Sequence, residues 1–269
     1  MKVVLAFASK EFADHLRNGW ILFLAAAYAI FALVITFAGF GFTGQVGPMD
    51  TTAALQSLTS LSLYLIPLMG LLLGFEGIVG EKERGLLDLL RTYPISASQI
   101  ILGKLMGLGL VLTLTLAIGL VIPFGLSLLA NGVTTWLVWP LYLGLSIWLG
   151  VIFIALALLL STVASERGTA LGMVLAIWLL LVLLFDLGVI GLLVATGGGV
   201  PESVLQALFI LNPASLFRVL ILGLVLGQDA MLALGIGGDG MSWPLLWAGM
   251  LIWTMLPAWA ATGRLRRME

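Results

Sequence analysis

Residues 100–130 read IILGKLMGLGLVLTLTLAIGLVIPFGLSLLA and contain a single charged residue, Lys104. A helix of about 20 apolar residues is long enough to cross the hydrocarbon core of a membrane. Lipid offers the backbone no hydrogen-bond partners, so a spanning run of this length satisfies its backbone only as a helix. The stretch therefore predicts a transmembrane helix.

Five other stretches of the chain have the same character. They run over about residues 19–40, 55–79, 136–163, 169–195 and 243–262. Over the whole chain 61% of residues are hydrophobic and 9% are charged, whereas a soluble domain carries about 25% charged residues. The predicted fold class is an all-α integral membrane protein with six transmembrane helices, formed by a single permease domain over residues 1–269.

Residues 204–227 are apolar enough to suggest a seventh span. Asn212 followed by Pro213, however, is typical of a helix N-cap and a first helical residue. A seventh span would also place the C-terminal arginines on the other side of the membrane. We therefore expect short helices packed on the outer face within a periplasmic region, residues 196–242, before the last span.

The basic residues predict the orientation of the chain. If the N-terminus is inside, every one of the 12 lysines and arginines except Arg218 falls on an inner segment. Cytoplasmic segments carry this excess in membrane proteins, so both termini are expected in the cytoplasm of a bacterium, with the chain in its inner membrane. The residues expected near the outer side are Asp50, Glu202, Asp229 and Asp239, together with the interfacial aromatics Trp136, Trp139, Trp243 and Trp247.

Residues 8–18 have the spacing of an amphipathic helix. Ala8, Phe12 and Leu16 fall on one arc at 100° per residue. The other arc holds Lys10, Glu11, Asp14, His15, Arg17 and Asn18. A helix of this kind lies in the membrane interface rather than crossing it.

The composition excludes several kinds of chemistry. The chain has no cysteine and one histidine, His15, and its net charge is −1. No Walker A sequence is present, because the glycine that should precede Gly103-Lys104 is missing. We therefore expect no catalytic residue, no metal site, no cofactor and no nucleic-acid partner.

Residues 80–104, GEKERGLLDLLRTYPISASQIILGK, form a polar interruption between two spans, with a loop at residues 81–99. Gly85 permits a bend, and Pro94 ends the helix that follows. Ser96 with Gln99 has capping-box spacing. An apolar face repeats at Leu86, Leu89, Leu90 and Tyr93. The pattern predicts a short amphipathic helix along the membrane surface, which could rest on lipid headgroups or dock on a partner.

The runs EKERGLLDLL, PIS and ILGK in this loop resemble the cytoplasmic loop of type V ABC exporter permeases. The resemblance extends over essentially the whole chain. It implies a dimeric permease whose coupling helix docks in a groove on a separate ATPase. The ATPase-coupling residues it implies are Glu81, Glu83, Gly85, Leu86, Asp88, Leu89, Leu90, Arg91 and Tyr93.

Three further stretches resemble a narrower group, the permeases of systems that mature nitrous oxide reductase. They are residues 57–85, FDLG at residues 185–188, and LNPASLFRVL at residues 211–220. This resemblance implies an ATPase partner and a periplasmic partner that acts in copper-site assembly.

A few isolated residues carry open alternatives. Glu76 and Asp186 are ionisable groups within spans, and each is either functional or simply paired. Asn212, Pro213 and Arg218 are candidate contacts for a periplasmic partner, although Arg218 could instead pair with an outer acid. The GxxxG pairs Gly70/Gly74 and Gly103/Gly107 predict close helix packing, within the chain or between subunits.

Rival functions make different demands. A secondary transporter needs discontinuous helices and midplane charges, which this sequence does not favour. A general type V exporter for another cargo and a passive membrane anchor stay open. Copper(I) would have to use thioether ligands, and Met69, Met106, Met173, Met250 and Met255 are scattered over the spans. A mechanical role is therefore favoured over copper conduction, unless a dimer brings methionines together.

Overall fold

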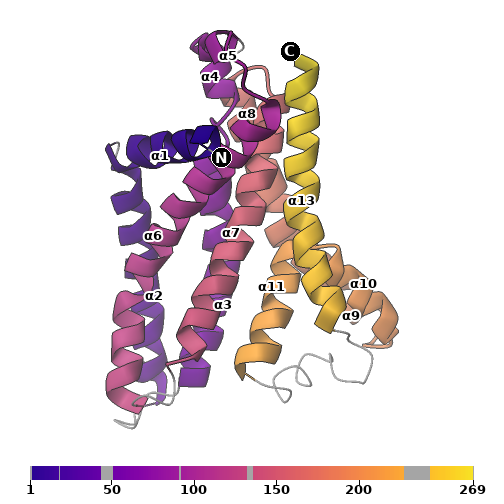
Figure 1. Cartoon of the computed structure of the whole chain (residues 1–269). Coiled ribbons are helices and arrows are strands. Elements are labelled where there is room, and N and C mark those ends of the chain that lie inside the picture. Colours follow the sequence, from indigo (N-terminus) through magenta and orange to yellow (C-terminus); the bar gives the residue numbers. More distant parts are fainter. Residues whose placement is uncertain are drawn as a thin grey trace.

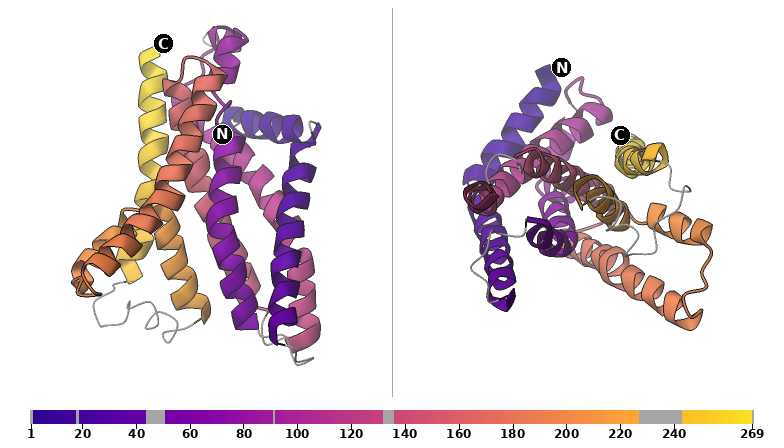
Figure 2. Two further views of the ribbon diagram at one scale, coloured as in Figure 1. Left: turned by 180° about the vertical axis from the view of Figure 1, so that it is seen from behind. Right: turned by 90° about the horizontal axis from the view of Figure 1, so that it is seen from below.

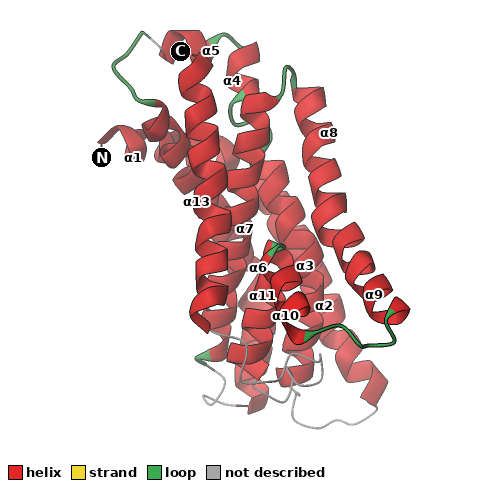
Figure 3. Cartoon of the chain, turned by 90° about the vertical axis from the view of Figure 1, so that its right-hand side faces the viewer, coloured by secondary structure: helices red, strands yellow, loops and turns green. Residues whose placement is uncertain are grey.

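The computed structural model describes residues 2–17, 19–43, 51–90, 92–131, 136–226 and 243–268. Within these residues the regular structure is helical, and no strand is found (Figure 3). The helical stretches long and apolar enough to cross a membrane are Leu55–Glu83, Ala97–Leu129, Val138–Val163, Arg167–Ala195 and Trp243–Met268. Helix α2, Trp20–Thr43, matches the remaining predicted span. The predicted all-α membrane fold is confirmed.

Both chain ends lie at the same end of the helix bundle, called the terminal end below (Figure 1). Helix α2 packs against α3 (Thr51–Gly74) and α6 (Ala97–Asn131), and both of these pack against α7 (Val138–Val163). Helix α13 (Trp243–Met268) packs on the other side of α7. Helix α1, Lys2–Arg17, lies across the bundle at the terminal end. The short helices α4 (Val79–Glu83) and α5 (Leu86–Leu90) project beyond it (Figure 1).

Close packing at glycines joins these helices. A Cβ atom on Gly70 would lie 2.7 Å from the Gly150 carbonyl oxygen, and one on Gly74 would lie 2.7 Å from Ala157 Cβ, both on α7. A Cβ atom on Gly107 of α6 would likewise lie 2.7 Å from the Ala8 carbonyl oxygen on α1. Both GxxxG pairs therefore serve packing within the chain.

A buried polar chain also links three of the helices. The Ser62 hydroxyl on α3 lies 2.8 Å from the Tyr28 hydroxyl on α2 and 2.7 Å from the Tyr142 hydroxyl on α7. Buried hydroxyls are costly unless they are hydrogen-bonded. These contacts fix α2, α3 and α7 in one register.

Helix α1 is longer than predicted, and part of its predicted polar face is buried. It begins at Lys2 rather than at residue 8. Glu11, predicted on the solvated arc, is buried against α6, which is a correction to the expected polar face. The reason is Lys104, whose ammonium group inside the bundle needs a carboxylate partner.

The fifth span is a continuous helix with a wider middle turn. It consists of α8 (Arg167–Trp178), a π-helical segment η2 (Leu179–Leu184) and α9 (Phe185–Ala195). It leans away from the other helices toward the end opposite the termini (Figure 2). Only 11% of its most apolar window is buried inside the chain.

The segment before the last span enters and leaves the bundle at the same end. Helices α10 (Glu202–Ile210) and α11 (Pro213–Ile221, continued by η3, Leu222–Leu226) meet at a bend of 113°. Both lie in the half of the molecule away from the termini (Figure 1). The predicted cap at Asn212 is present, because its Oδ1 accepts the Ala214 N–H at 2.9 Å. The chain thus makes short helices here, but α11 is buried between α3, α7 and α13 rather than packed on an outer face.

Of the aromatic residues predicted at the outer side, one is exposed and another is buried. Trp136 is exposed, as expected of an interfacial residue. Trp139 is buried, and its indole N–H donates to the Ser127 hydroxyl at 3.1 Å, so its interfacial assignment is wrong. Three predicted outer acids, Asp50, Asp229 and Asp239, lie outside the described residues, as does the side chain of Glu202.

Candidate functional site

The candidate site begins where the second span breaks. Helix α3 ends at Gly74, and turns over residues 75–78 lead into α4. The first N–H groups of a helix have no partner inside it. Here the N–H groups of Ile78 and Val79 donate to the Ser161 hydroxyl on α7, at 3.0 and 2.9 Å. Helix α7 therefore fixes the start of α4.

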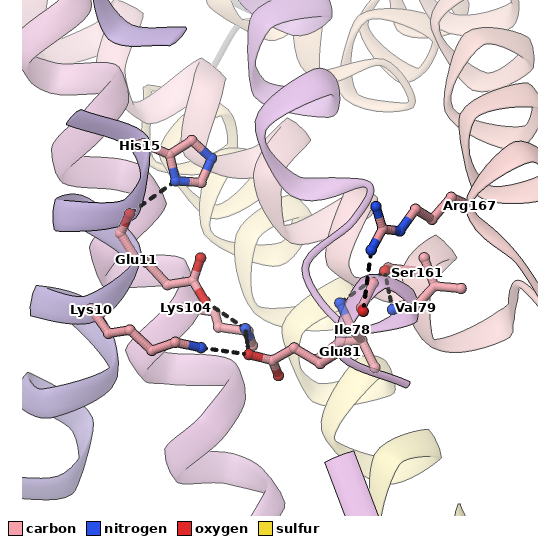
Figure 4. Close-up of polar contacts among 10 residues, drawn as sticks. Lys10, Glu11, His15, Ile78, Val79, Glu81, Lys104, Ser161 and Arg167 are labelled. Carbon is pink, nitrogen blue, oxygen red and sulfur yellow. Dashed lines mark hydrogen bonds and ion pairs between the residues drawn. The ribbon is translucent and has the colours of Figure 1, made fainter. Parts of the chain in front are cut away.

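Helix α4 turns one carboxylate into the protein (Figure 4). The Glu81 Oε1 atom lies 2.9 Å from the Lys104 ammonium on α6 and 3.0 Å from the Lys10 ammonium on α1. Lys104 also lies 2.6 Å from Glu11 Oε1 on α1. We call these four residues the charge network. It joins α1, α4 and α6 at one point.

The charge network is balanced, with two ammonium groups and two carboxylates. Lys104 is only 1% exposed, and a buried charge is tolerated when it is paired. Burial alone would lower the pKa of Lys10, but the nearby Glu81 carboxylate outweighs this and raises the pKa above its ordinary value. Lys10 therefore stays charged at neutral pH. The second oxygen of Glu81, Oε2, is buried without a hydrogen-bond partner in the described part of the chain.

A second ion pair joins α4 to the fifth span. The Arg167 guanidinium at the start of α8 lies 2.8 Å from Glu83 Oε2 and 3.5 Å from Glu76 Oε2. The backbone N–H of Arg167 also donates to Glu83 Oε1 at 2.8 Å. Glu76 is thus paired with a basic residue, although that residue belongs to the next loop on this side rather than to its own.

Beyond α4 the chain presents an apolar face. Gly85 has a φ of +70°, a left-handed conformation that favours glycine, and it separates α4 from α5 as the predicted bend. Leu87 of α5 is buried, whereas Leu86, Leu89 and Tyr93 are 37%, 56% and 58% exposed. Helix α5 ends at Leu90, so the predicted helix is shorter than expected and Tyr93 lies in the bend after it. We call the three exposed side chains of Leu86, Leu89 and Tyr93 the α5 face.

The end of the loop follows the predicted capping pattern. The Ser96 N–H donates to the Gln99 side-chain oxygen at 3.1 Å, and α6 begins at Ala97. The side chains of Asp88 and Leu90, and the whole of Arg91, lie outside what the structure describes. The other residues assigned to coupling lie together at the terminal end, where Glu81 points inward and Glu83 points toward Arg167.

Sequence reasoning missed the partners of this loop. Lys10, Glu11, Lys104, Ser161 and Arg167 were not identified as parts of one site. The available signal was Lys104, a lone charge near the start of an otherwise apolar span, because such a charge requires an acidic partner nearby.

A second polar cluster lies in the other half of the bundle. The Arg218 guanidinium on α11 lies 2.5 Å from Asp186 Oδ2 on α9. The Asn212 side-chain amide donates to the Leu181 carbonyl oxygen of the π-helical segment at 2.5 Å. Wider turns of this kind shift the backbone hydrogen-bond ladder and often accompany functional sites. Asp186, Asn212 and Arg218, singled out separately in the sequence, thus tether the fifth span, at η2 and α9, to α11.

Comparison with known proteins defines the class. The family model for ABC-2 family transporter proteins matches residues 5–269, and the chain belongs to this family. It is the membrane-spanning permease subunit of an ABC transporter, a multi-pass membrane protein that works with an ATPase partner.

Two relatives make the comparison more specific. The chain is 38% identical over 279 residues to the "Probable ABC transporter permease protein NosY" of Pseudomonas aeruginosa, with 99% of each chain covered. It is 38% identical over 266 residues to the protein of the same description from Stutzerimonas stutzeri, with 94% of each chain covered. The predicted permease family is confirmed.

Proposed function

We propose that this chain is the permease of a nos-type ABC transporter that takes part in copper-site maturation of nitrous oxide reductase. Its partners would be a NosF-like ATPase, a NosD-like periplasmic protein and a second copy of itself. The terminal end would face the cytoplasm across the bacterial inner membrane. Similarity to NosY permeases over nearly the whole chain supports this assignment.

The observation that carries the coupling role is the α5 face. Leu86 and Leu89 are exposed on α5, which projects beyond the membrane-spanning bundle (Figure 1), and Tyr93 is exposed in the bend after it. Exposed apolar clusters with a polar surround are typical of docking surfaces. The ATPase would cover this face, and ATP hydrolysis would take place in that partner, not in the permease.

The charge network supplies a path for transmitting motion. Glu81 ties α4 to α6 and α1 through Lys104 and Lys10, whereas Glu83 ties α4 to α8 through Arg167. A displacement of α5 by the ATPase would therefore move α1, α6 and the fifth span together. Packed, ion-paired elements transmit such shifts because they have few intermediate arrangements.

The fifth span is the surface proposed for the second copy. Helices α8, η2 and α9 bury little of their apolar surface within the chain. Gly168 and Gly172 have GxxxG spacing, and a Cβ atom on Gly172 would meet nothing within 4 Å. Small residues on an open helix face let a second helix approach closely in lipid.

The methionine positions favour a mechanical role over copper conduction. Met69 and Met250 are buried in the core, whereas Met106 and Met255 are exposed on the outside of the bundle. A copper(I) relay needs neighbouring soft ligands. ATP-driven motion passed to the periplasmic partner through α9 and α11 requires none.

The proposed function is tested in a strain that makes nitrous oxide reductase. Deleting this chain should leave the reductase protein present but with incomplete copper, and expressing the chain again should restore the copper content. A fully copper-loaded reductase in the deletion strain would rule out this assignment.

A further inference from the structure

An open groove lies between α6 and α13 near the terminal end. Its volume is about 790 Å³, within the range of about 300–1,000 Å³ usual for ligand sites. The lining is almost entirely apolar. It includes Ser98 and Leu102 at the start of α6, with Met255, Leu256, Trp259 and Arg266 on α13.

The side chains that form the walls of the groove are exposed, whereas its floor is buried. Trp259 is 78% exposed, and Leu102, Met255 and Leu256 are about half exposed. Ile101 at the floor is fully buried, so the groove is a surface channel and not an opening into the core. Gly263 lies in the lining, and a Cβ atom there would meet nothing within 4 Å. Because Gly263 has no side chain, nothing at this position separates the apolar walls from Arg266.

We propose that this groove binds one anionic phospholipid, with an acyl chain along α13 and the headgroup phosphate held by Arg266 and Ser98. The length of the groove matches a single lipid. From Ile252 to Arg266 it covers 15 residues of α13, and the 14 steps between them rise about 21 Å at 1.5 Å per residue. Half of a bilayer, headgroups included, is about 20–22 Å thick. A second transmembrane helix would instead extend over the whole thickness of the bilayer.

The charge at the end of the groove selects the headgroup. Arg266 is exposed in the last turn of α13 and makes no ion pair with any described residue. Arginine forms strong charge-assisted hydrogen bonds with phosphate oxygens. The Ser98 hydroxyl lies 3.0 Å from the Ser96 hydroxyl, and it is a further donor to the phosphate when Ser96 donates to it. Basic sites between transmembrane helices bind anionic lipid headgroups by this chemistry. Free phosphate would use the polar end alone and leave the apolar walls uncovered.

The test is a lipid titration of the purified full-length permease, followed by native mass spectrometry. Dioleoylphosphatidylglycerol is the anionic probe and dioleoylphosphatidylcholine the neutral one. Arg266→Ala should weaken phosphatidylglycerol binding about tenfold, the effect of one charge-assisted hydrogen bond. Arg266→Lys should keep most of the affinity. Arg267→Ala removes the same charge one position along the helix, outside the groove, and should leave the affinity close to that of the wild type.

A second variant tests the apolar part of the site. A Cβ atom at Gly263 meets nothing within 4 Å, so Gly263→Leu should place its side chain in the groove and reduce phosphatidylglycerol binding while thermal stability is kept. The proposal is overturned if Arg266→Ala and Arg267→Ala act alike, if phosphatidylcholine binds as tightly, or if inorganic phosphate competes fully with the lipid. It is also overturned if Gly263→Leu converts a dimer to a monomer, because a second copy would then cover the groove.

Discussion

The Glu81 carboxylate lies 2.9 Å from the Lys104 ammonium, and this contact joins a helix of the loop to the first turns of a membrane span. Lys104 is almost completely buried, so its charge is tolerated only because Glu81 and Glu11 neutralise it. The loop between the second and third spans is therefore part of the packed structure at its base. Leu87 of α5 is buried as well, so α5 is also anchored while the α5 face stays exposed.

Replacing Lys104 with methionine should destabilise the permease strongly. The change leaves Glu81 and Glu11 buried together without their shared partner, which costs about 3–5 kcal/mol. Thermal unfolding in detergent measures the loss. Lys10→Met is the matched control, because Lys10 is half exposed and its pair is worth about 1 kcal/mol or less. Equal effects of the two variants would contradict the buried network.

Ser161→Ala should loosen the start of α4. The variant leaves the N–H groups of Ile78 and Val79 unpaired in a buried position, at a cost of about 1–3 kcal/mol. The expected result is a lower unfolding temperature together with faster proteolysis of the loop. Ser60→Ala serves as control, since Ser60 is exposed and bonds only to its own helix. If both serine variants behave like the wild type, Ser161 does not hold this break.

The contact between Asp186 and Arg218 can be tested by cross-linking, because the chain has no native cysteine. A short bifunctional thiol reagent should join the pair Asp186→Cys and Arg218→Cys within one chain. The pair Leu187→Cys and Arg218→Cys should react poorly, since Leu187 points away into an exposed position. Locking the first pair should also reduce coupled ATPase activity if α9 moves during the cycle. Equal cross-linking of both pairs would count against the tether.

The orientation of the chain is open to a direct test. A reporter fused after Gly238 should lie in the periplasm, and one fused after Glu269 in the cytoplasm. The reason is the distribution of the basic residues, which leaves only Arg218 outside. Two fusions that report the same side would contradict a single crossing, by the last span, between Gly238 and Glu269.

The sequence was sufficient for the features that depend on local pattern. Span positions follow from apolar length, the break at Asn212-Pro213 follows from capping chemistry, and the start of α6 follows from the Ser96 and Gln99 pattern. Each of these is decided by residues close together in the chain, so no knowledge of distant neighbours is needed.

The features it did not predict depend on which helices pack together. Glu11 looked solvated because its own helix gave no sign of Lys104, 93 positions away. Trp139 looked interfacial because a tryptophan near a span end usually is, but Ser127 and Tyr142 enclose it here. Helix α11 was expected on the outer face of the protein, because the sequence of an apolar helix face is the same whether that face contacts lipid or α7.

The central claim is that the α5 face binds the ATPase, and Leu89→Asp tests it most directly. A carboxylate at a position covered by an apolar groove costs several kcal/mol. The affinity-tagged permease is co-expressed with its ATPase, and the amount of ATPase that co-purifies is measured. Leu129→Asp is the control, because Leu129 is more exposed than Leu89 and lies at the opposite end of the bundle.

Both variants should insert in the membrane and purify in wild-type amounts. The account predicts that Leu89→Asp releases the ATPase and that Leu129→Asp retains it. Retention of the ATPase by Leu89→Asp, with ATPase activity unchanged, would contradict the account.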